Sequence, residues 1–342
     1  MGAALLRFSL EAVSKLYAAI IALRNLAYSK GRLKVHTTGV PLISVGNITV
    51  GGTGKTPLVI WLCRFLRQKQ IHCAVLTRGY KVRATRTDEP AVLAENCPNA
   101  KIIVNPDRVA GAAEAVNKFG ASVLIIDDGF QNRRLHRDLD IVTIDATRPF
   151  GYGKMLPAGL LREPVVSLKR ADAAVLTRCD QISRSELNRI EKQLQLINPD
   201  MVIAKSIHNP SCVKSLTGRE IPIEQLKNKK ILAFCGIANP DAFFNTIDKL
   251  GCDIVSSKIY DDHHRYTEGC LADIYEQAAD SKIDLILTTQ KDWTKVAQLM
   301  LVKKDIPITY LAIELKFISG EDKITQLIED ALAGKIILSQ NV

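Results

Sequence analysis

The feature that most constrains this chain is the stretch 41–62, PLISVGNITVGGTGKTPLVIWL. An apolar run predicts a short buried strand, a glycine-rich turn follows it, and an amphipathic helix begins near Lys55. This order is typical of a phosphate-binding loop, in which backbone N–H groups and the positive end of the helix dipole surround phosphate oxygens. Lys55 is expected to reach the β- and γ-phosphates, and the Thr56 hydroxyl is expected to hold Mg²⁺. The predicted nucleotide contacts are Thr49, Val50, Gly51, Gly52, Thr53, Gly54, Lys55 and Thr56.

The loop departs from the usual pattern, G-x-x-x-x-G-K-[ST], because Thr49 occupies its first glycine position. A glycine-rich turn with an incidental lysine is the alternative interpretation. The placement after an apolar run and the presence of Thr56 favour a phosphate loop. Membrane-cycling ATPases with a K-G-G-x-G-K-T loop need a lysine where this chain has Val50, which disfavours that subclass.

Two further segments contribute candidate carboxylates. The segment 121–130, ASVLIIDDGF, predicts a buried strand ending in Asp127 and Asp128, where phosphate-loop enzymes have metal-side carboxylates. A helix-capping pair is the alternative for these two residues. The polar, basic segment 78–90, RGYKVRATRTDEP, predicts a loop with Asp88 near its end. Asp88 is either a solvated carboxylate or a functional one on the side where doubly wound sheets bind ligands.

The composition predicts a globular protein of two domains that meets an anionic partner. The 342 residues are 47% hydrophobic and 24% charged, and the net charge is +10. An anionic membrane or a phosphorylated substrate fits this charge. Nucleic acid is not expected, because aromatic residues make up only 6% of the chain and no nucleic-acid-binding motif is present. No protein partner is predicted. The eight cysteines form no C-x-x-C pair, so they predict reduced, buried thiols in a cytosolic compartment.

Residues 1–30 predict an amphipathic helix. Apolar residues recur at helical spacing, and the segment 1–36 carries six basic residues against one acidic residue. The longest uncharged run, 16–23, is too short to span a bilayer, which takes about 20 residues. The segment therefore predicts a helix lying in an anionic membrane interface. Packing of the same stripe on the core is the alternative, and one helix can do both.

The order of predicted elements indicates an α/β fold, a P-loop NTPase-like α/β/α sandwich with a second, smaller α/β domain. A new strand–turn–helix rhythm begins at Lys230, and the alternating stretch 306–317 is expected to pair with the preceding extended segment. The predicted divisions are an interfacial helix (1–30), the P-loop core (31–205), a crossing strand (206–217), the second domain (218–305), and a return strand with the C-terminal helix (306–342).

Two other segments are weaker indicators. His263 and His264 are adjacent, so their side chains point apart and are not expected to bind the same metal ion. No further His/Cys cluster in the sequence completes a zinc site. One of them is a candidate to orient a catalytic carboxylate, and a surface or capping role is the alternative. The sequence TRCD at 177–180 is similar to a T-K-x-D base-reading loop with arginine in place of lysine. It does not decide between ATP and GTP.

Seven segments occur in a fixed order over residues 35–295: SVGNITVGGTGKTP, RGY followed by DEP, LIIDDGFQNRRLHRDLDIV, LPAGLLREP, FCGIANP, DHHRYT and TTQKD. In this order they resemble the tetraacyldisaccharide 4′-kinases, the lipid A 4′-kinases of Gram-negative envelope synthesis. Thr49 in place of the first loop glycine is itself typical of that family. The resemblance implies transfer of the ATP γ-phosphoryl group, with Mg²⁺, to the 4′-hydroxyl of a membrane-embedded tetraacylated glucosamine disaccharide 1-phosphate. It also implies a peripheral position at the cytoplasmic face of the inner membrane.

The resemblance further implies roles for individual residues. Lys55 and Thr56 would hold phosphates and Mg²⁺, with Asp127 and Asp128 in the metal and loop network.

On the acceptor side, the resemblance implies that Asp88 takes the proton of the sugar hydroxyl. His263, favoured over His264, would orient Asp88 or tune its pKa. Arg162 and Glu163 would meet the disaccharide headgroup.

Two other functions remain open from the sequence. A phosphate-loop kinase of a soluble sugar or cofactor would have no need of the amphipathic N-terminal helix. A nucleotide-driven membrane regulator without a small-molecule acceptor would need a lysine at Val50, and would have no use for the DEP and DHH segments.

Overall fold

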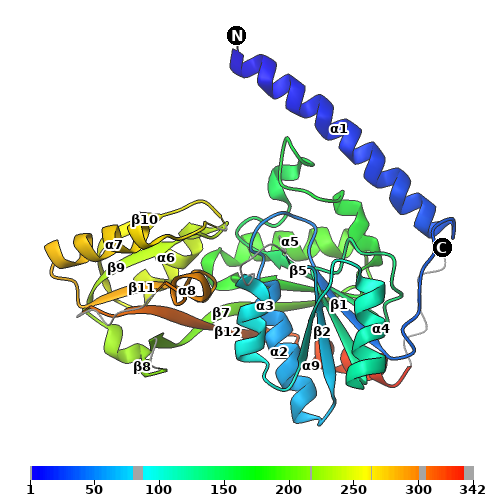
Figure 1. Ribbon diagram of the computed structural model, residues 1–342. Helices are drawn as coiled ribbons and strands as arrows, with labels where there is room; N and C mark the ends of the chain where they lie inside the picture. Colours follow the sequence, from blue (N-terminus) through cyan, green and yellow to red (C-terminus); the bar gives the residue numbers. More distant parts are fainter. Residues whose placement is uncertain (1, 80–87, 216–217, 263, 300–305, 335–342) are drawn as a thin grey trace. The chain divides into compact units, whose positions relative to one another are not determined.

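The computed structural model describes residues 2–79, 88–215, 218–262, 264–299 and 306–334 (Figure 1). Within the chain, contacts divide into two compact units. Unit 1 comprises Met1–Val82, Leu93–Ile207 and Leu315–Val342, and unit 2 comprises Arg83–Val92 and His208–Glu314. The domain limits drawn from the sequence stay a prediction.

Two long strands contain residues of both units, β7 (Val202–Ser215) and β12 (Ile308–Ser319). They are hydrogen-bonded neighbours in the sheet, which confirms the expected pairing of the stretch 306–317 with the crossing segment.

The sheet of unit 1 has the strand order β7-β6-β5-β1-β4-β2-β3, with parallel neighbours. Its strands are β1 (Leu42–Gly46), β2 (Cys73–Thr77), β3 (Lys101–Val104), β4 (Val123–Asp127), β5 (Leu139–Asp145) and β6 (Ala173–Thr177). Val45 pairs with Asp127, so β1 and β4 end side by side. The loops that follow these strands therefore share one edge of the sheet, where parallel sheets bind ligands.

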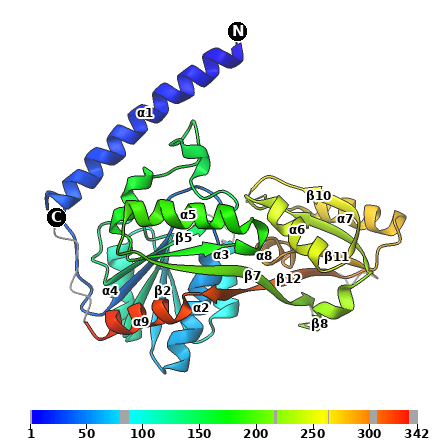
Figure 2. The same ribbon diagram turned by 180° about the vertical axis from the view of Figure 1, so that it is seen from behind.

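Helices cover both faces of this sheet. The helices with most of their residues in unit 1 are α1 (Gly2–Ser29), α2 (Lys55–Gln68), α4 (Arg108–Phe119), α5 (Arg184–Ile197) and α9 (Glu321–Leu332). Strand residues such as Leu42 and Val142 join apolar clusters that include α4 and α5. Alternate residues such as Ile43 point the other way, where α2 and α9 contact β1. Figures 1 and 2 show α5 on one side of these strands and α2 and α9 on the other, as expected for an α/β/α sandwich.

Local signals explain several helix ends in unit 1. The Asp107 side chain accepts a hydrogen bond from the Val109 N–H at the start of α4, and Gly120 closes that helix in the left-handed conformation. Ser183 and Glu186 form a reciprocal capping box at the start of α5.

The prediction of a loop over 78–90 was wrong for its last three residues. Helix α3 (Asp88–Asn96) begins at Asp88, with Glu89 and Pro90 in its first turn. Acidic residues are favoured in the first turn because they complement the helix dipole. Proline is favoured there because it has no N–H, and an N–H in the first turn would have no partner within the helix. Strand β3 was not predicted.

Unit 2 contains a second parallel set in the order β10-β9-β11-β12. Its elements are β8 (Glu220–Pro222), β9 (Lys230–Cys235), α6 (Pro240–Lys249), β10 (Asp253–Ile259), α7 (Glu268–Asp280), β11 (Leu285–Thr289) and α8 (Gln290–Val296). Leu232 and Phe234 of β9 pack with α7 and α8, whereas Ile231 and Ala233 pack with α6. The second, smaller α/β body predicted from the sequence is therefore present, and helices cover both of its faces.

Candidate functional site

The loop between β1 and α2 has the backbone that phosphate binding needs. Gly51 and Gly54 have φ values of 110° and 90°, a region that residues with a Cβ rarely adopt. Gly54 is the N-cap of α2 and supplies no side-chain hydrogen bond to the helix. The amides at the start of α2 are thus not capped by a side chain of the N-cap residue, as an anion site at a helix N-terminus requires.

Buried hydroxyls fix this loop from the neighbouring strands. The Asn47 side chain donates to Thr53 Oγ1 at 2.9 Å, and Thr53 Oγ1 lies 2.7 Å from Thr143 Oγ1 of β5. Thr177 Oγ1 of β6 donates to the Thr53 carbonyl at 2.9 Å. Sequence reasoning missed Asn47, Thr143 and Thr177 as supports. For Thr143 and Thr177 the available signal was a threonine among the apolar residues of a predicted strand, and Asn47 carries no such signal.

Lys55 and Asp128 face each other at the centre of the site. Lys55 is buried, and its Nζ lies 3.4 Å from Asp128 Oδ1. Arg162 Nη1 donates to both Asp128 oxygens, at 3.0 and 2.8 Å. Burial raises the pKa of Asp128, but the positive charges of Lys55 and Arg162 outweigh it and hold the pKa at about 2. The carboxylate is therefore ionised at any physiological pH.

The loop that carries Arg162 is aligned by backbone pairing with the phosphate loop. Thr49 forms an antiparallel bridge with Leu161, the Val50 N–H donates to the Leu160 carbonyl at 2.8 Å, and the Arg162 N–H donates to the Ile48 carbonyl at 2.7 Å. These contacts link segments more than 100 residues apart in the sequence, so no local pattern predicts them.

Asp127 lies beside this cluster at the end of β4, with only 2% of its surface exposed. Arg108 Nη2 donates to its backbone carbonyl at 3.4 Å, and burial lowers the pKa of Arg108 to about 10. The donor set fits Mg²⁺, which takes hard oxygen ligands and commonly uses one or two carboxylates together with phosphates. Asp127, Asp128 and the Thr56 hydroxyl supply such oxygens. No group of three His, Cys, Asp or Glu side chains suited to a metal occurs in the described part of the chain.

Glu163, for which the family resemblance implies contact with the headgroup, is enclosed by other side chains of this chain. Its side chain is fully buried, and it accepts from Arg24 Nη2 at 3.2 Å, from Asn25 Nδ2 at 2.8 Å and from Arg170 Nη2 at 2.9 Å. Burial raises its pKa, but Arg170, Asn25 and Arg24 outweigh this and keep the pKa below its ordinary value. The geometry gives Glu163 an internal contact between α1 and the loop, and offers no support for direct contact with a sugar.

Helix α1 has two different long faces. Ser14 and Ile21 are buried, and the Ser14 hydroxyl donates to the Met155 carbonyl at 2.8 Å. The opposite face exposes a stripe of large apolar side chains, Val13, Leu16, Ile20 and Leu23, each at least half exposed. The helix therefore packs on unit 1 and also presents an apolar surface. Its contact with a membrane interface stays a prediction. None of the helices among the described residues combines the length and apolarity needed to cross a membrane.

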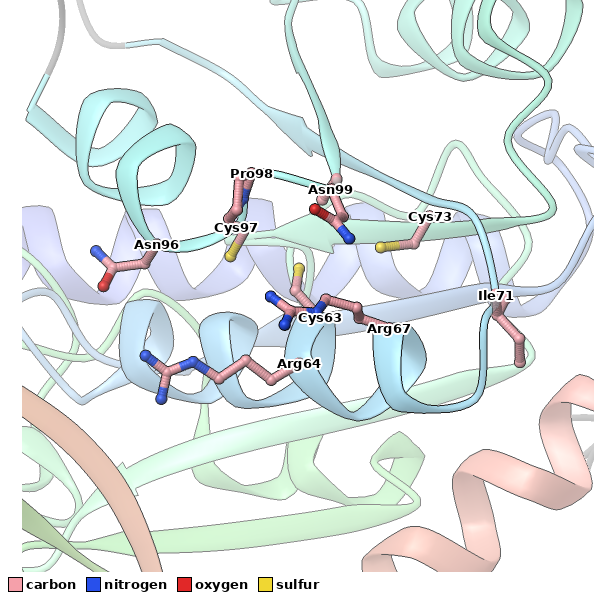
Figure 3. Close-up of a pocket in the computed structure, with 10 residues that line it drawn as sticks. Cys63, Arg64, Arg67, Ile71, Cys73, Asn96, Cys97, Pro98 and Asn99 are labelled. Carbon is pink, nitrogen blue, oxygen red and sulfur yellow. The ribbon is translucent and has the colours of Figure 1, made fainter.

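A small pocket in unit 1 lies away from the phosphate loop. Figure 3 shows it beside α2, where its lining includes Cys63, Arg67, Cys73 and Cys97. Cys63 is about two helical turns from Lys55 along α2. The pocket is therefore not part of the nucleotide site. All eight cysteines are free thiols; the prediction of buried thiols holds for five of them, and Cys212, Cys252 and Cys270 are half-buried.

The comparison with known proteins agrees with this geometry. A family model described as tetraacyldisaccharide-1-P 4′-kinase (LpxK) matches residues 6–333. The chain belongs to this family. It is 36% identical to a tetraacyldisaccharide 4′-kinase of Syntrophus aciditrophicus, over 90% of this chain and 88% of that one. It is also 37% identical to that of Syntrophotalea carbinolica, over 92% and 90% of the two chains.

A solved structure supports the same assignment. The crystal structure of LpxK from Aquifex aeolicus in complex with ATP matches with a TM-score of 0.72 and 30% identity, covering 96% of this chain and 99% of that one. The P-loop kinase fold, the ATP-dependent kinase class and the resemblance seen in the sequence are thereby confirmed. ATP, rather than GTP, is the nucleotide found in this family member.

Two residues implied by the family resemblance have side chains outside the described part of the structure. Asp88 is the first residue of α3, and nothing is described of its side chain; His263 is not among the described residues. His264 is described. Its ring stacks on Tyr260 at 4.5 Å, meets Tyr266 edge-on at 5.0 Å, and has Nε2 at 3.7 Å from Cys270 Sγ. The roles of Asp88 and His263 stay predictions.

Proposed function

We propose that this LpxK-family kinase transfers the γ-phosphoryl group of ATP to the 4′-hydroxyl of a tetraacyldisaccharide 1-phosphate lipid, giving the 1,4′-bisphosphate of lipid A biosynthesis. The observation that carries the proposal is the cluster of Lys55, Asp128 and Arg162 at the open N-terminus of α2. Phosphoryl transfer needs positioning and charge stabilisation more than covalent help. Lys55 and Arg162, which pair with Asp128 beside the glycine loop, supply both the positioning and the positive charge.

Each part of the phosphate site has a separate task in this proposal. Residues 49–56 form the loop that binds the phosphates, with the Val50 N–H already used in its bond to the Leu160 carbonyl. Lys55 places positive charge on the β- and γ-phosphates. Thr56, Asp127 and Asp128 would hold Mg²⁺, which when bound neutralises charge on the phosphate oxygens. Asp128 also holds Lys55 in place through their ion pair.

On the acceptor side, Asp88 is proposed as the base that takes the proton of the 4′-hydroxyl. His263 is proposed to orient Asp88, because the neighbouring His264 is already engaged in ring contacts with Tyr260 and Tyr266. Arg162 is proposed to meet the acceptor phosphate or sugar from the loop beside the nucleotide. Glu163 is proposed to support Arg162 instead of binding the headgroup itself.

The acceptor is proposed to be reached from a membrane surface, with the protein peripheral at the cytoplasmic face of the inner membrane. The exposed stripe of α1 supports this, since an amphipathic helix with basic residues lies in an anionic interface. The double substitution Leu16→Ser with Leu23→Ser should reduce sedimentation with vesicles that contain anionic phospholipid. Leu196→Ser is the control, because Leu196 on α5 is 84% exposed but belongs to another helix. Equal sedimentation of all three proteins would refute membrane binding through α1.

The function itself is tested by incubating the protein with radiolabelled ATP, Mg²⁺ and a tetraacyldisaccharide 1-phosphate. A labelled bisphosphate lipid is the expected product. Label in a soluble sugar phosphate but not in the lipid would favour the kinase of a soluble acceptor. Nucleotide-dependent dimerisation without any transfer product would favour a membrane regulator.

Asp88→Ala should lower turnover by about 10²–10⁴-fold, the usual contribution of a general base, and leave ATP binding nearly intact. Turnover is measured with the labelled product and ATP affinity by calorimetry. Glu95→Ala is the matched control, because Glu95 is an exposed acidic residue on the same helix. Normal turnover of Asp88→Ala would remove this residue from the mechanism.

A further inference from the structure

Helix α1 is attached to the phosphate site by polar contacts as well as by packing. The Tyr17 hydroxyl donates to the Arg162 backbone carbonyl at 3.0 Å. Arg24 Nη2 and Asn25 Nδ2 donate to the two oxygens of Glu163, at 3.2 and 2.8 Å. Three polar side chains of one helix thus bind two consecutive residues of the loop that pairs with the phosphate loop.

These contacts continue to Asp128 along two short routes. The first runs through Arg162, whose backbone is held by Tyr17 and whose guanidinium donates to Asp128. The second runs through Glu163 to Arg170, which donates to the Phe130 carbonyl at 3.0 Å and lies 3.8 Å above the Phe130 ring. Phe130 is only two residues beyond Asp128.

Because the Glu163 carboxylate is buried, its position depends on the side chains that donate hydrogen bonds to it. The Glu163 carboxylate is fully buried, and a buried carboxylate that loses its hydrogen-bond donors must find others or move. Without Arg24 and Asn25, Arg170 alone would remain among the described donors to this carboxylate. The backbone at 163 would then be held less tightly, although Tyr17 and the Ile48 carbonyl still bond to Arg162, and a small shift there would move the Arg162 guanidinium.

We infer that Tyr17, Arg24 and Asn25 of α1 are positioning residues for phosphoryl transfer, holding the 162–163 backbone so that Arg162 stays on Asp128. The inference rests on the proposed function and deepens it. The helix that offers its apolar stripe to lipid is, by its other face, a structural part of the phosphate site. The proposed contact of α1 with lipid and the alignment of Arg162 therefore depend on the same helix.

The test separates this coupling from simple anchoring by using an acceptor in solution. A disaccharide 1-phosphate with acyl chains short enough to stay monomeric is offered with ATP and no vesicles, so that membrane binding cannot contribute. The double variant Arg24→Gln with Asn25→Ala should lower kcat by roughly 10- to 100-fold, the scale of a small misplacement of a reacting group. The KM for the acceptor should rise by a smaller factor, because Arg162 is also proposed to meet the acceptor. The single variant Arg24→Lys keeps the positive charge and retains Asn25. Its kcat should therefore be much closer to that of the unsubstituted protein than the kcat of the double variant is.

Ala22→Gln is the matched control, because Ala22 is an exposed residue of the same helix. Tyr17→Phe removes a single hydroxyl and keeps the ring, so it should fold and should lower kcat by a smaller factor than the double variant. If Tyr17→Phe, Arg24→Lys and the double variant all turn over the soluble acceptor at the unsubstituted rate, α1 is only an anchor and the inference is overturned. If the double variant does not fold, an unchanged kcat of Tyr17→Phe has the same meaning.

Hydrogen exchange tests the positioning without any reference to activity. The Arg162 amide donates to the Ile48 carbonyl at 2.7 Å, and its protection should fall in the double variant but not in Ala22→Gln. If the unsubstituted protein gives no lipid product, the proposed function fails while this measurement still decides the positioning. Unchanged protection of Arg162 would overturn the positioning even where the kinase activity is confirmed.

Discussion

Two strand–turn–helix segments, one in each unit, have the same local order. They differ in whether the first amides of the helix are capped by a side chain of the N-cap residue. In unit 1, β1 leads into α2, whose N-cap Gly54 contributes no side-chain hydrogen bond. In unit 2, β9 leads into α6, where the Asn239 side chain accepts from the Ala242 N–H at 3.3 Å and Pro240 removes a further donor. The first terminus is available to an external anion, and the second is closed by the chain itself.

The strand ends differ in the same way. In unit 2 the Gly236 N–H just after β9 donates to Asp292 Oδ2 at 3.0 Å, so a carboxylate of the protein occupies the position that an anion could take. In unit 1 the Asp128 carboxylate pairs with the side chains of Lys55 and Arg162 instead of with loop amides. A glycine turn before a helix is therefore not sufficient for phosphate binding. What matters is whether the surrounding side chains leave its N–H groups unsatisfied.

Among the variants that test this comparison, the largest effect is expected from Lys55→Ala, which removes the buried cation that distinguishes the first segment. Transfer to the lipid should fall by roughly 10²–10³-fold, as for the loss of one preorganised charge-stabilising group. The measurement is formation of labelled bisphosphate at saturating ATP. Lys192→Ala, an exposed lysine on α5, is the control and should behave as the unsubstituted protein. Equal rates for both variants would mean that the α2 terminus is no more catalytic than the α6 terminus.

A smaller effect, on stability, is expected from Asp292→Ala in the second segment. Asp292 is fully buried and also accepts from the half-buried Thr289 Oγ1 at 2.7 Å, so its removal leaves the buried Gly236 N–H without this partner. Unit 2 should lose about 1–3 kcal/mol of unfolding free energy. In a Trp61→Phe background, Trp293 fluorescence reports unit 2 alone during urea unfolding. Asp248→Ala, an exposed aspartate of α6, should leave the midpoint unchanged; an unchanged midpoint for Asp292→Ala would show that this carboxylate does not stabilise the closed terminus.

The sequence predicts the parts of the site that depend on local order. Lys55 and Thr56 follow a glycine turn, and Asp127 and Asp128 end an apolar strand, so the parallel sheet brings them to one edge. The fold class follows from the same alternation of strands and helices.

The contacts missed by the sequence are long-range. Glu163 is polar and lies in a Pro- and Gly-rich loop, which favours an exposed ligand-binding role, but three donors from α1 and the segment after the loop bury it. The start of α3 was missed for another reason, since the basic run before Asp88 outweighed the signal of Pro90 in a first helical turn. Only the packed chain reveals the burial of Glu163, whereas Pro90 is a local signal for the start of α3.

The smallest effect concerns acid stability, and it sharpens the contrast between the two segments. The pKa of Asp128 is held at about 2 in the folded state, despite burial, by Lys55 and Arg162, while an unfolded aspartate titrates near 3.9. A lowered pKa stabilises the folded state above the unfolded value, and this contribution is lost as the pH falls towards 2. Unit 1 should therefore lose about 1 kcal/mol from this group between pH 5 and pH 3. In a Trp293→Phe background, Trp61 fluorescence reports unit 1, and Asp128→Asn should remove this part of the acid slope. If the unfolding free energy of unit 1 depends on pH in the same way in Asp128→Asn, the ion pairs of Asp128 with Lys55 and Arg162 do not stabilise the fold. The role of the carboxylate would then be confined to nucleotide binding.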